Sequence, residues 1–125
     1  MKPVRVYEYK GCGTCRKAIA YLEAKGVPYE RIPIRDQPPS LEELKQMLEI
    51  LQGNLKKLFN TSGGDYKEMN LKEVLPTWTE KQALEALSSH GNLVKRPFAL
   101  HGKNGVIGFK AVSYTHLTLP TKRIV

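Results

Sequence analysis

A short glycine-rich segment holding both cysteines joins a strand-like run to a helix-like run near the start of the chain. This segment is Gly11-Cys12-Gly13-Thr14-Cys15-Arg16-Lys17. Before it, residues 4–9 alternate in polarity and are rich in β-branched and aromatic side chains, which is typical of a strand. After it, apolar residues recur at helical spacing until Gly26, which ends the run. The two cysteines are therefore predicted to lie where a strand leads into a helix N-terminus.

This location predicts a reactive thiol. Unpaired backbone N–H groups and the helix dipole favour a thiolate over a thiol at a helix N-terminus. Arg16 and Lys17 add positive charge beside it. Glycines on both sides of Cys12 allow a tight turn and the close approach of a substrate. We interpret Cys12 as a low-pKa nucleophile and Cys15, one helical turn later, as its resolving thiol.

Two other interpretations of the cysteine pair stay open. A zinc site needs about four ligands, and the other candidates, His90, His101 and His116, include no closely spaced ligand pair. We therefore expect no metal site. Inert buried thiols are the second alternative, because free cysteine is often buried. A glycine-flanked helix start favours redox or nucleophilic chemistry over both.

Length and apolar patterning restrict the class of protein. A chain of 125 residues suits one domain with a single core. No apolar run approaches the ~20 residues of a membrane span, and no signal-peptide pattern precedes the first strand. Two cysteines close together do not resemble a secreted disulfide scaffold. We expect a protein of the reducing cytoplasm with no membrane partner.

The net charge of +8 is spread over the chain. Basic residues are densest at Arg16-Lys17, Lys56-Lys57 and Lys95-Arg96, among many acidic ones. Nucleic-acid surfaces usually show a basic stripe or aromatic stacking positions, and neither is evident. An anionic small substrate or an acidic partner surface fits this pattern better than direct nucleic-acid binding.

The order of predicted elements defines the fold class. A second strand within residues 27–34 follows the first helix, parallel to the first strand by a right-handed crossover. Pro33 indicates that this strand lies at an edge of the sheet. Several helices follow, and residues 93–100 and 106–110 form a β-hairpin. The prediction is an α/β fold, a mixed sheet with helices on its faces.

Two of the intervening helices carry capping signals. Ser40 with Glu43, and Thr79 with Gln82, match the capping-box pattern. The first helix places leucine and methionine side chains on one stripe that is expected to be buried, starting at Leu41. Gly91 is expected to end the second helix. Residues 60–65 read as a polar turn.

Four motifs together resemble the arsenate reductase (ArsC)/Spx family of thioredoxin-like proteins. The motifs are Tyr9–Ala18 around the cysteines, Gly26–Tyr29, Leu93–Pro97, and Gly108-Phe109. The resemblance runs from Val4 to Lys110 and implies a thioredoxin-like sheet with a helical insertion between its second and third strands.

The end of the chain does not match this family. Residues 112–125 look like a translated adaptor sequence, a read-through artefact. The family domain is therefore assigned to residues 1–111. The helix that closes the sheet in this family is expected to be missing.

Four further residues, Arg96, Pro97, Arg16 and Asn60, are expected to line the substrate site, and the resemblance supports the roles of Arg96 and Pro97. Arg96 is expected to bind an oxyanion, for which a guanidinium is well suited, and Pro97 to be cis and to face Cys12. Arg16 is expected to tune the local field. Reductases and Spx regulators carry an arginine in the turn where this chain has Asn60, which brings no charge. One lost charge-assisted bond weakens oxyanion stabilisation by roughly 1.5–3 kcal/mol, which calls arsenate reduction into question.

The resulting hypothesis is a thiol–disulfide oxidoreductase of arsenate reductase type acting on a small oxyanion or thiol substrate. It would bind no cofactor and draw on an external thiol donor, glutathione or thioredoxin or glutaredoxin. The alternative is an Spx-like regulator that binds RNA polymerase and uses the cysteine pair as a redox switch. A redox-inert relative is the third possibility.

Overall fold

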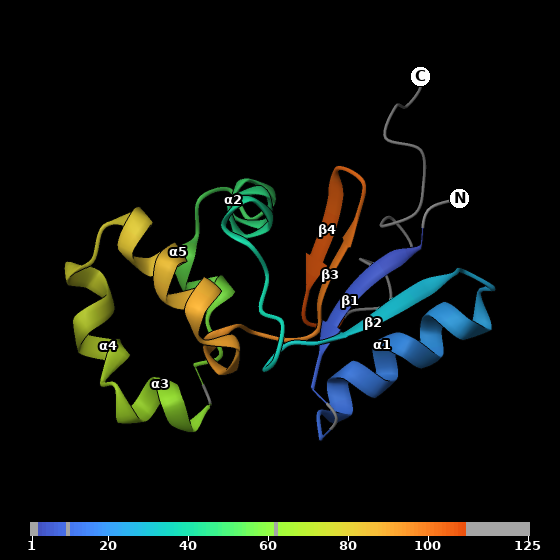
Figure 1. Cartoon of the computed structure of the whole chain (residues 1–125), viewed down its shortest axis with the longest axis horizontal. Coiled ribbons are helices and arrows are strands. Elements are labelled where there is room, and N and C mark those ends of the chain that lie inside the picture. Colours follow the sequence, from blue (N-terminus) through green and yellow to red (C-terminus); the bar gives the residue numbers. More distant parts are fainter. Residues whose placement is uncertain (1–2, 10, 62, 110–125) are drawn as a thin grey trace.

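The computed structural model describes residues 3–9, 11–61 and 63–109. The described part alternates strands and helices at its start, continues through a helical insertion, and ends in a hairpin (Figure 1). In chain order the α-helices and strands are β1 (Val4–Glu8), α1 (Gly13–Ala24), β2 (Tyr29–Pro33), α2 (Leu41–Ile50), α3 (Gly64–Glu68), α4 (Leu71–Val74), α5 (Glu80–Ser89), β3 (Phe98–His101) and β4 (Asn104–Ile107). Short 3-10 turns cover Leu55–Leu58, Leu75–Thr77 and Gly91–Leu93.

The described strands form one mixed sheet in the order β2-β1-β3-β4. β1 pairs in parallel with β2 and antiparallel with β3, and β3 pairs antiparallel with β4. The predicted parallel crossover, the edge position of the strand with Pro33, and the final hairpin are confirmed. The strands of the hairpin differ from the predicted ranges 93–100 and 106–110, since β3 starts only at Phe98 and β4 already starts at Asn104. Glu8 lies opposite Pro33, and Tyr7 lies opposite Phe98. The C-terminal ends of β1 and β2 therefore lie beside the start of β3, and together they form one edge of the sheet, the edge made by strand ends.

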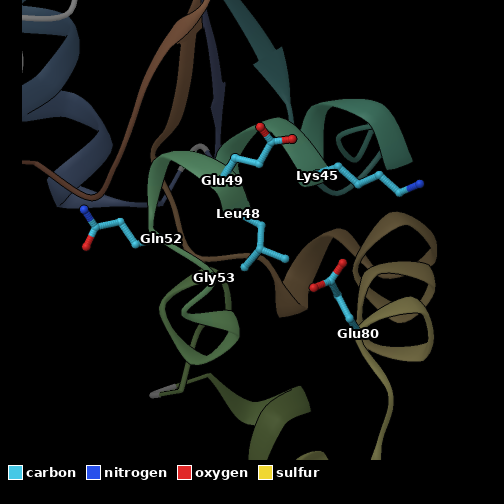
Figure 2. Close-up of a pocket in the computed structure, with 6 residues that line it drawn as sticks. All are labelled: Lys45, Leu48, Glu49, Gln52, Gly53 and Glu80. Atoms are coloured by element: carbon cyan, nitrogen blue, oxygen red, sulfur yellow. The ribbon is translucent and has the colours of Figure 1, made fainter.

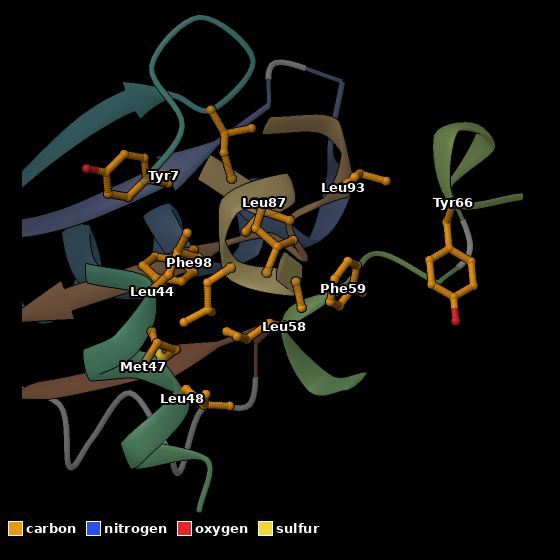
Figure 3. Packing of buried hydrophobic residues seen from close by; sticks show 14 of the residues in the cluster. Tyr7, Leu44, Met47, Leu48, Leu58, Phe59, Tyr66, Leu87, Leu93 and Phe98 are labelled. Atoms are coloured by element: carbon orange, nitrogen blue, oxygen red, sulfur yellow. The ribbon is translucent and has the colours of Figure 1, made fainter. Parts of the chain in front are cut away.

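The sheet is covered on both faces, as predicted. Because side chains alternate along a strand, Val4 and Val6 face α1 and Tyr7 faces the helical insertion. The smaller cluster against α1 contains Val4, Val6, Ala18, Ile19, Leu22 and Ala99. Figure 3 shows the larger cluster, in which residues of β1, β3, α2, α5 and the intervening turns pack together, among them Tyr7, Phe98, Leu44, Met47, Leu87 and Phe59.

Both capping boxes are present, at Ser40 with Glu43 and at Thr79 with Gln82. The expectation for Leu41 is wrong, because its side chain is 41% exposed. Leu41 is the first residue of α2 and precedes the turns that pack on the sheet. The polar turn expected over residues 60–65 is shorter than predicted, since α3 already begins at Gly64 and buries the ring of Tyr66.

The capping glutamate of α2 also joins this helix to the sheet. Glu43 accepts hydrogen bonds from the Tyr7 hydroxyl, at 2.7 Å, and from the Ser40 backbone, at 3.0 Å, and it pairs with Arg5. Burial acts to raise the pKa of Glu43, but the bonds from Ser40 and Tyr7 and the charge of Arg5 outweigh it and leave this pKa lowered.

This arrangement predicts an acid-dependent stability. A carboxyl whose pKa is lower in the folded state stabilises the fold above its unfolded pKa of about 4.3, and that stabilisation is lost as pH falls through the folded pKa. Between pH 7 and pH 3, the free energy of unfolding measured by urea titration should fall less for Glu43→Gln than for the unmodified chain. Equal losses in the two proteins would contradict the role given to Glu43, and Glu42→Gln, on the same helix turn, is the control.

The suspected read-through tail at residues 112–125, and with it the expected loss of a closing helix, lies outside the described residues.

Candidate functional site

Cys12 itself forms the N-terminal cap of α1. Its backbone is extended, with φ −89° and ψ 112°, and its Sγ accepts a hydrogen bond from the backbone N–H of Cys15 at 3.2 Å. Its own N–H donates to the Tyr9 carbonyl at 3.0 Å, which closes the turn after β1. The Cys12 sulfur therefore lies at the N-terminus of α1, at the positive end of the helix dipole. The Cys12 side chain is partly exposed, so a substrate can reach it.

Cys15 occupies a different environment one turn into α1. Its side chain is fully buried. Burial, followed by the hydrogen bond and charge of Cys12, raises the pKa of the Cys15 thiol to about 12. Both cysteines are free thiols in this structure. The pair is thus asymmetric, with one accessible sulfur that accepts a hydrogen bond and one protonated sulfur behind it.

The two glycines beside Cys12 differ in what they allow. A Cβ on Gly11 would lie 3.0 Å from the Tyr9 ring, whereas a Cβ on Gly13 would meet nothing within 4 Å. Neither glycine is among the residues with positive φ. Gly11 therefore permits the close packing of the turn on Tyr9, and Gly13 leaves open space at the mouth of the helix.

Arg96 and Pro97 reach the same edge of the sheet from the start of β3. The Arg96-Pro97 peptide bond is cis, as predicted, and Pro97 is buried. The Arg96 Cζ lies 5.1 Å from the centroid of the Tyr9 ring. Its Nη1 is buried and has no hydrogen-bond partner. Because the Tyr9 carbonyl also accepts the Cys12 N–H, this guanidinium lies beside the loop that carries Cys12.

Arg35 is a second arginine at this edge, and the sequence analysis missed it. It follows β2 by two residues, and its Cζ lies 4.0 Å from the centroid of the same Tyr9 ring. Its Nε donates to the Asn92 side chain at 2.5 Å. A usable signal was present in the sequence, because the ends of parallel neighbouring strands meet at one sheet edge. A charged residue just after the second strand therefore belongs beside the cysteine loop.

The positions of Arg16 and Asn60 do not indicate a role in substrate binding. Arg16 is exposed in the first turn of α1, next to Cys15. Asn60 is partly buried, and its backbone N–H donates to the Leu93 carbonyl at 2.7 Å. The turn with Asn60 thus runs beside the segment that leads to Arg96. The proposed roles of Arg16, Asn60, Arg96 and Pro97 stay predictions.

A groove of about 610 Å³ adjoins the cysteine loop. It extends from Thr14 of the cysteine motif past Arg96 and is bordered by two further cations, Lys57 and Lys95, and by apolar side chains including Ile50 and Ile107. A separate hollow of about 430 Å³ lies between α2 and the start of α5, where Figure 2 shows Lys45, Glu49 and Glu80 of mixed charge around Leu48. The groove beside Thr14 combines positive charge with a position next to the cysteine motif.

The residues that the structure covers contain no cluster of three or more histidine, cysteine or acidic side chains placed to hold a metal. His116, one of the candidate ligands, lies outside the described residues. Among the helices of the described ranges, none has the length and apolar content to cross a membrane.

Comparison with known proteins identifies relatives along most of the chain. The family model described as the ArsC family matches residues 7–117. The protein YusI of Bacillus subtilis is 50% identical over 104 residues, which cover 83% of this chain and 88% of YusI. The global transcriptional regulator Spx of Listeria innocua is 27% identical over 106 residues, 85% of this chain and 79% of Spx. A solved structure described as a possible arsenate reductase from Streptococcus mutans has a TM-score of 0.80 and 37% identity, covering 86% of this chain and 91% of that one.

Proposed function

We propose, because this chain belongs to the ArsC family, that it is a thiol–disulfide oxidoreductase with Cys12 as nucleophile and Cys15 as resolving thiol. One observation carries the proposal. The partly exposed Cys12 sulfur caps α1 and receives an N–H bond, while the buried thiol of Cys15 stands one turn behind it. An inert buried pair would not present one sulfur to solvent at a helix N-terminus.

The proposed reaction proceeds in two exchanges. The Cys12 thiolate attacks one sulfur of a substrate disulfide, so that the substrate S–S bond breaks, a mixed disulfide forms and one substrate thiolate leaves. That leaving thiolate takes up a proton. Cys15 then loses its proton and attacks the Cys12 sulfur, which releases the second substrate thiol and forms a Cys12–Cys15 disulfide. The pair has supplied two electrons, and two equivalents of an external thiol donor restore it.

The raised pKa of the Cys15 thiol has a function in these two exchange reactions. A resolving thiol that stays protonated cannot compete with Cys12 for the substrate. It becomes a nucleophile once the mixed disulfide has formed and a base has taken its proton. We expect glutathione or a thioredoxin-type or glutaredoxin-type protein as the donor, and the reducing cytoplasm as the site of action.

Arg96 is the proposed ligand for a negative group on the substrate. Its unpartnered, buried Nη1 would gain a charge-assisted hydrogen bond from an oxyanion or carboxylate. Since Asn60 stands where reductases of the family carry a further arginine, we expect small thiol or disulfide substrates to be processed faster than arsenate.

A single-turnover experiment tests the proposal. The fully reduced chain is mixed with excess 2-hydroxyethyl disulfide, and in parallel with arsenate, without any donor. The expected result is one disulfide reduced per chain, with the loss of two hydrogen atoms from the mass of the protein, which a Cys12–Cys15 disulfide explains. A chain that keeps both thiols after hours in the disulfide would contradict the proposal.

The similarity to Spx supports a second candidate, a redox-controlled regulator that binds RNA polymerase. Pull-down of purified polymerase with the oxidised and the reduced chain distinguishes the two functions. Capture by the oxidised form alone, without repeated turnover of the disulfide substrate when a thiol donor is supplied, would favour the regulator. Turnover without capture favours the enzyme.

A further inference from the structure

We propose that Arg35 is a second anion-positioning residue of the Cys12 site, acting together with Arg96 on a substrate whose negative group lies beside the reacting atom. The inference rests on the proposed function and deepens it, because it adds the charge that Asn60 does not supply. Its starting point is that two guanidinium groups contact one aromatic ring, Tyr9, at 4.0 Å and 5.1 Å.

The topology of the sheet brings these groups together. β1 lies between β2 and β3, with β2 parallel and β3 antiparallel to it. The residues after β2 and those before β3 therefore flank the end of β1 on its two sides. Arg35 comes from the first flank and Arg96 from the second, and Tyr9 stands between them, three residues before Cys12.

No carboxylate of the described residues neutralises the charges of this pair. Two other arginines have carboxylate partners, since Arg31 pairs with Glu8 at 3.1 Å and Arg5 pairs with Glu43. Within residues 3–9, 11–61 and 63–109, neither Arg35 nor Arg96 forms an ion pair with a carboxylate. Two like charges on one ring, together with the orphaned Nη1 of Arg96, indicate that an anion completes the site.

The contacts of Arg35 suit such a role. Stacking on an aromatic face holds a guanidinium in position and leaves its N–H groups directed outward at its edge. The bond from Nε to Asn92 uses one donor of Arg35, so its two Nη groups remain for a ligand. An anion held by two guanidinium groups gains hydrogen bonds from both.

The charge of the alkylating reagent provides a direct test. In the Cys15→Ala chain, Cys12 is the sole thiol, and its alkylation rates are measured with iodoacetate, an anion, and with iodoacetamide, its neutral counterpart. The ratio of the two rates reports the local positive potential and cancels changes in thiol reactivity. Arg35→Gln is expected to lower this ratio by about 3- to 10-fold, and Arg35→Lys should restore most of it.

Lys25→Gln provides the matched control. Lys25 is also a cation over a tyrosine ring, with its Nζ 5.7 Å from the Tyr21 centroid, but it follows the C-terminal end of α1, opposite Cys12. It should change the ratio by less than about 1.5-fold, since its charge is screened over this distance. Asn92→Ala, which removes the bond to Arg35 but no charge, should lower the ratio less than Arg35→Gln.

The outcomes separate the two proposals. If Arg35→Gln and Lys25→Gln give the same ratio while the unmodified chain reduces its disulfide substrate, the role of Arg35 is wrong and the proposed function stands. If the unmodified chain reduces no disulfide, the proposed function fails, whatever the ratios. Arg35 is exposed, so the glutamine variant should fold, which its urea midpoint will verify. Should it unfold, Arg35→Met, which also removes the charge but keeps a long side chain, takes its place, and an unchanged ratio in that variant would overturn the inference.

Discussion

Replacing Cys12 with serine is expected to abolish disulfide reduction, with a fall in the single-turnover rate of roughly a thousandfold or more. A serine hydroxyl can still accept the N–H bond of Cys15 that begins α1, because serine is a favoured helix cap. The fold should therefore persist while the nucleophile is lost, since the hydroxyl stays protonated and cannot form the mixed disulfide. The measurement is the release of substrate thiol by the reduced chain under excess 2-hydroxyethyl disulfide.

Cys15→Ser provides the comparison. Its first exchange should proceed near the normal rate and stop at the mixed disulfide, visible as a stable mass increase of one substrate half. An added thiol donor can release this adduct, so activity is diminished and not lost. Full activity in Cys12→Ser, or complete loss of the first exchange in Cys15→Ser, would reverse the assignment of nucleophile and resolving thiol.

Gly91→Ala is expected to destabilise the fold by about 3 kcal/mol, at the upper end of the usual range for overpacking. An alanine Cβ would lie 1.8 Å from the Ile34 carbonyl oxygen and 2.7 Å from its carbon. These are backbone atoms, so no side-chain rotation relieves the clash, and the segment after β2 must separate from the turn at Gly91–Leu93. The midpoint of urea unfolding measures the effect.

A second glycine provides a control for Gly91→Ala. Gly64 begins α3, has no atom within 4 Å of a built Cβ and is not among the residues with positive φ. Gly64→Ala should be neutral or stabilising by up to about 1 kcal/mol, because alanine favours helix. Equal midpoints for the two alanine variants would show that the chain accommodates the contact at Gly91. Gly91→Ala should also displace Arg35 from Tyr9, since Arg35 Cα lies 3.1 Å from the same Cβ.

Features that depend on neighbouring residues were predictable from the sequence. The strand, the cysteine turn and α1 follow one another within 21 residues of chain, and their periodicity and glycines are local signals. The two capping boxes depend on side chains three residues apart. The parallel crossover and the edge position of Pro33 followed from general rules of sheet topology.

Features that depend on tertiary contacts were not predictable. Gly91 reads as a helix stop, but its main constraint is the backbone of Ile34, far away in the sequence. The exposure of Leu41 depends on where α2 meets the sheet, which the spacing of leucines does not determine. The contact of Arg35 with Tyr9 and Asn92 joins three separate segments, and no single window of residues contains it.

The Cys12 sulfur caps α1 and is also the proposed nucleophile, and these two roles conflict. As the cap of α1 it accepts the N–H of Cys15, and an electron-rich sulfur accepts that bond better than a sulfur already joined to another. Conversion of Cys12 to a disulfide would therefore weaken this hydrogen bond at the start of α1. Because the bond is stronger in the dithiol, it favours the reduced form of the pair. In the proposed reaction, this effect would make the Cys12–Cys15 disulfide easier for the thiol donor to reduce than the disulfide of an unconstrained pair of cysteines.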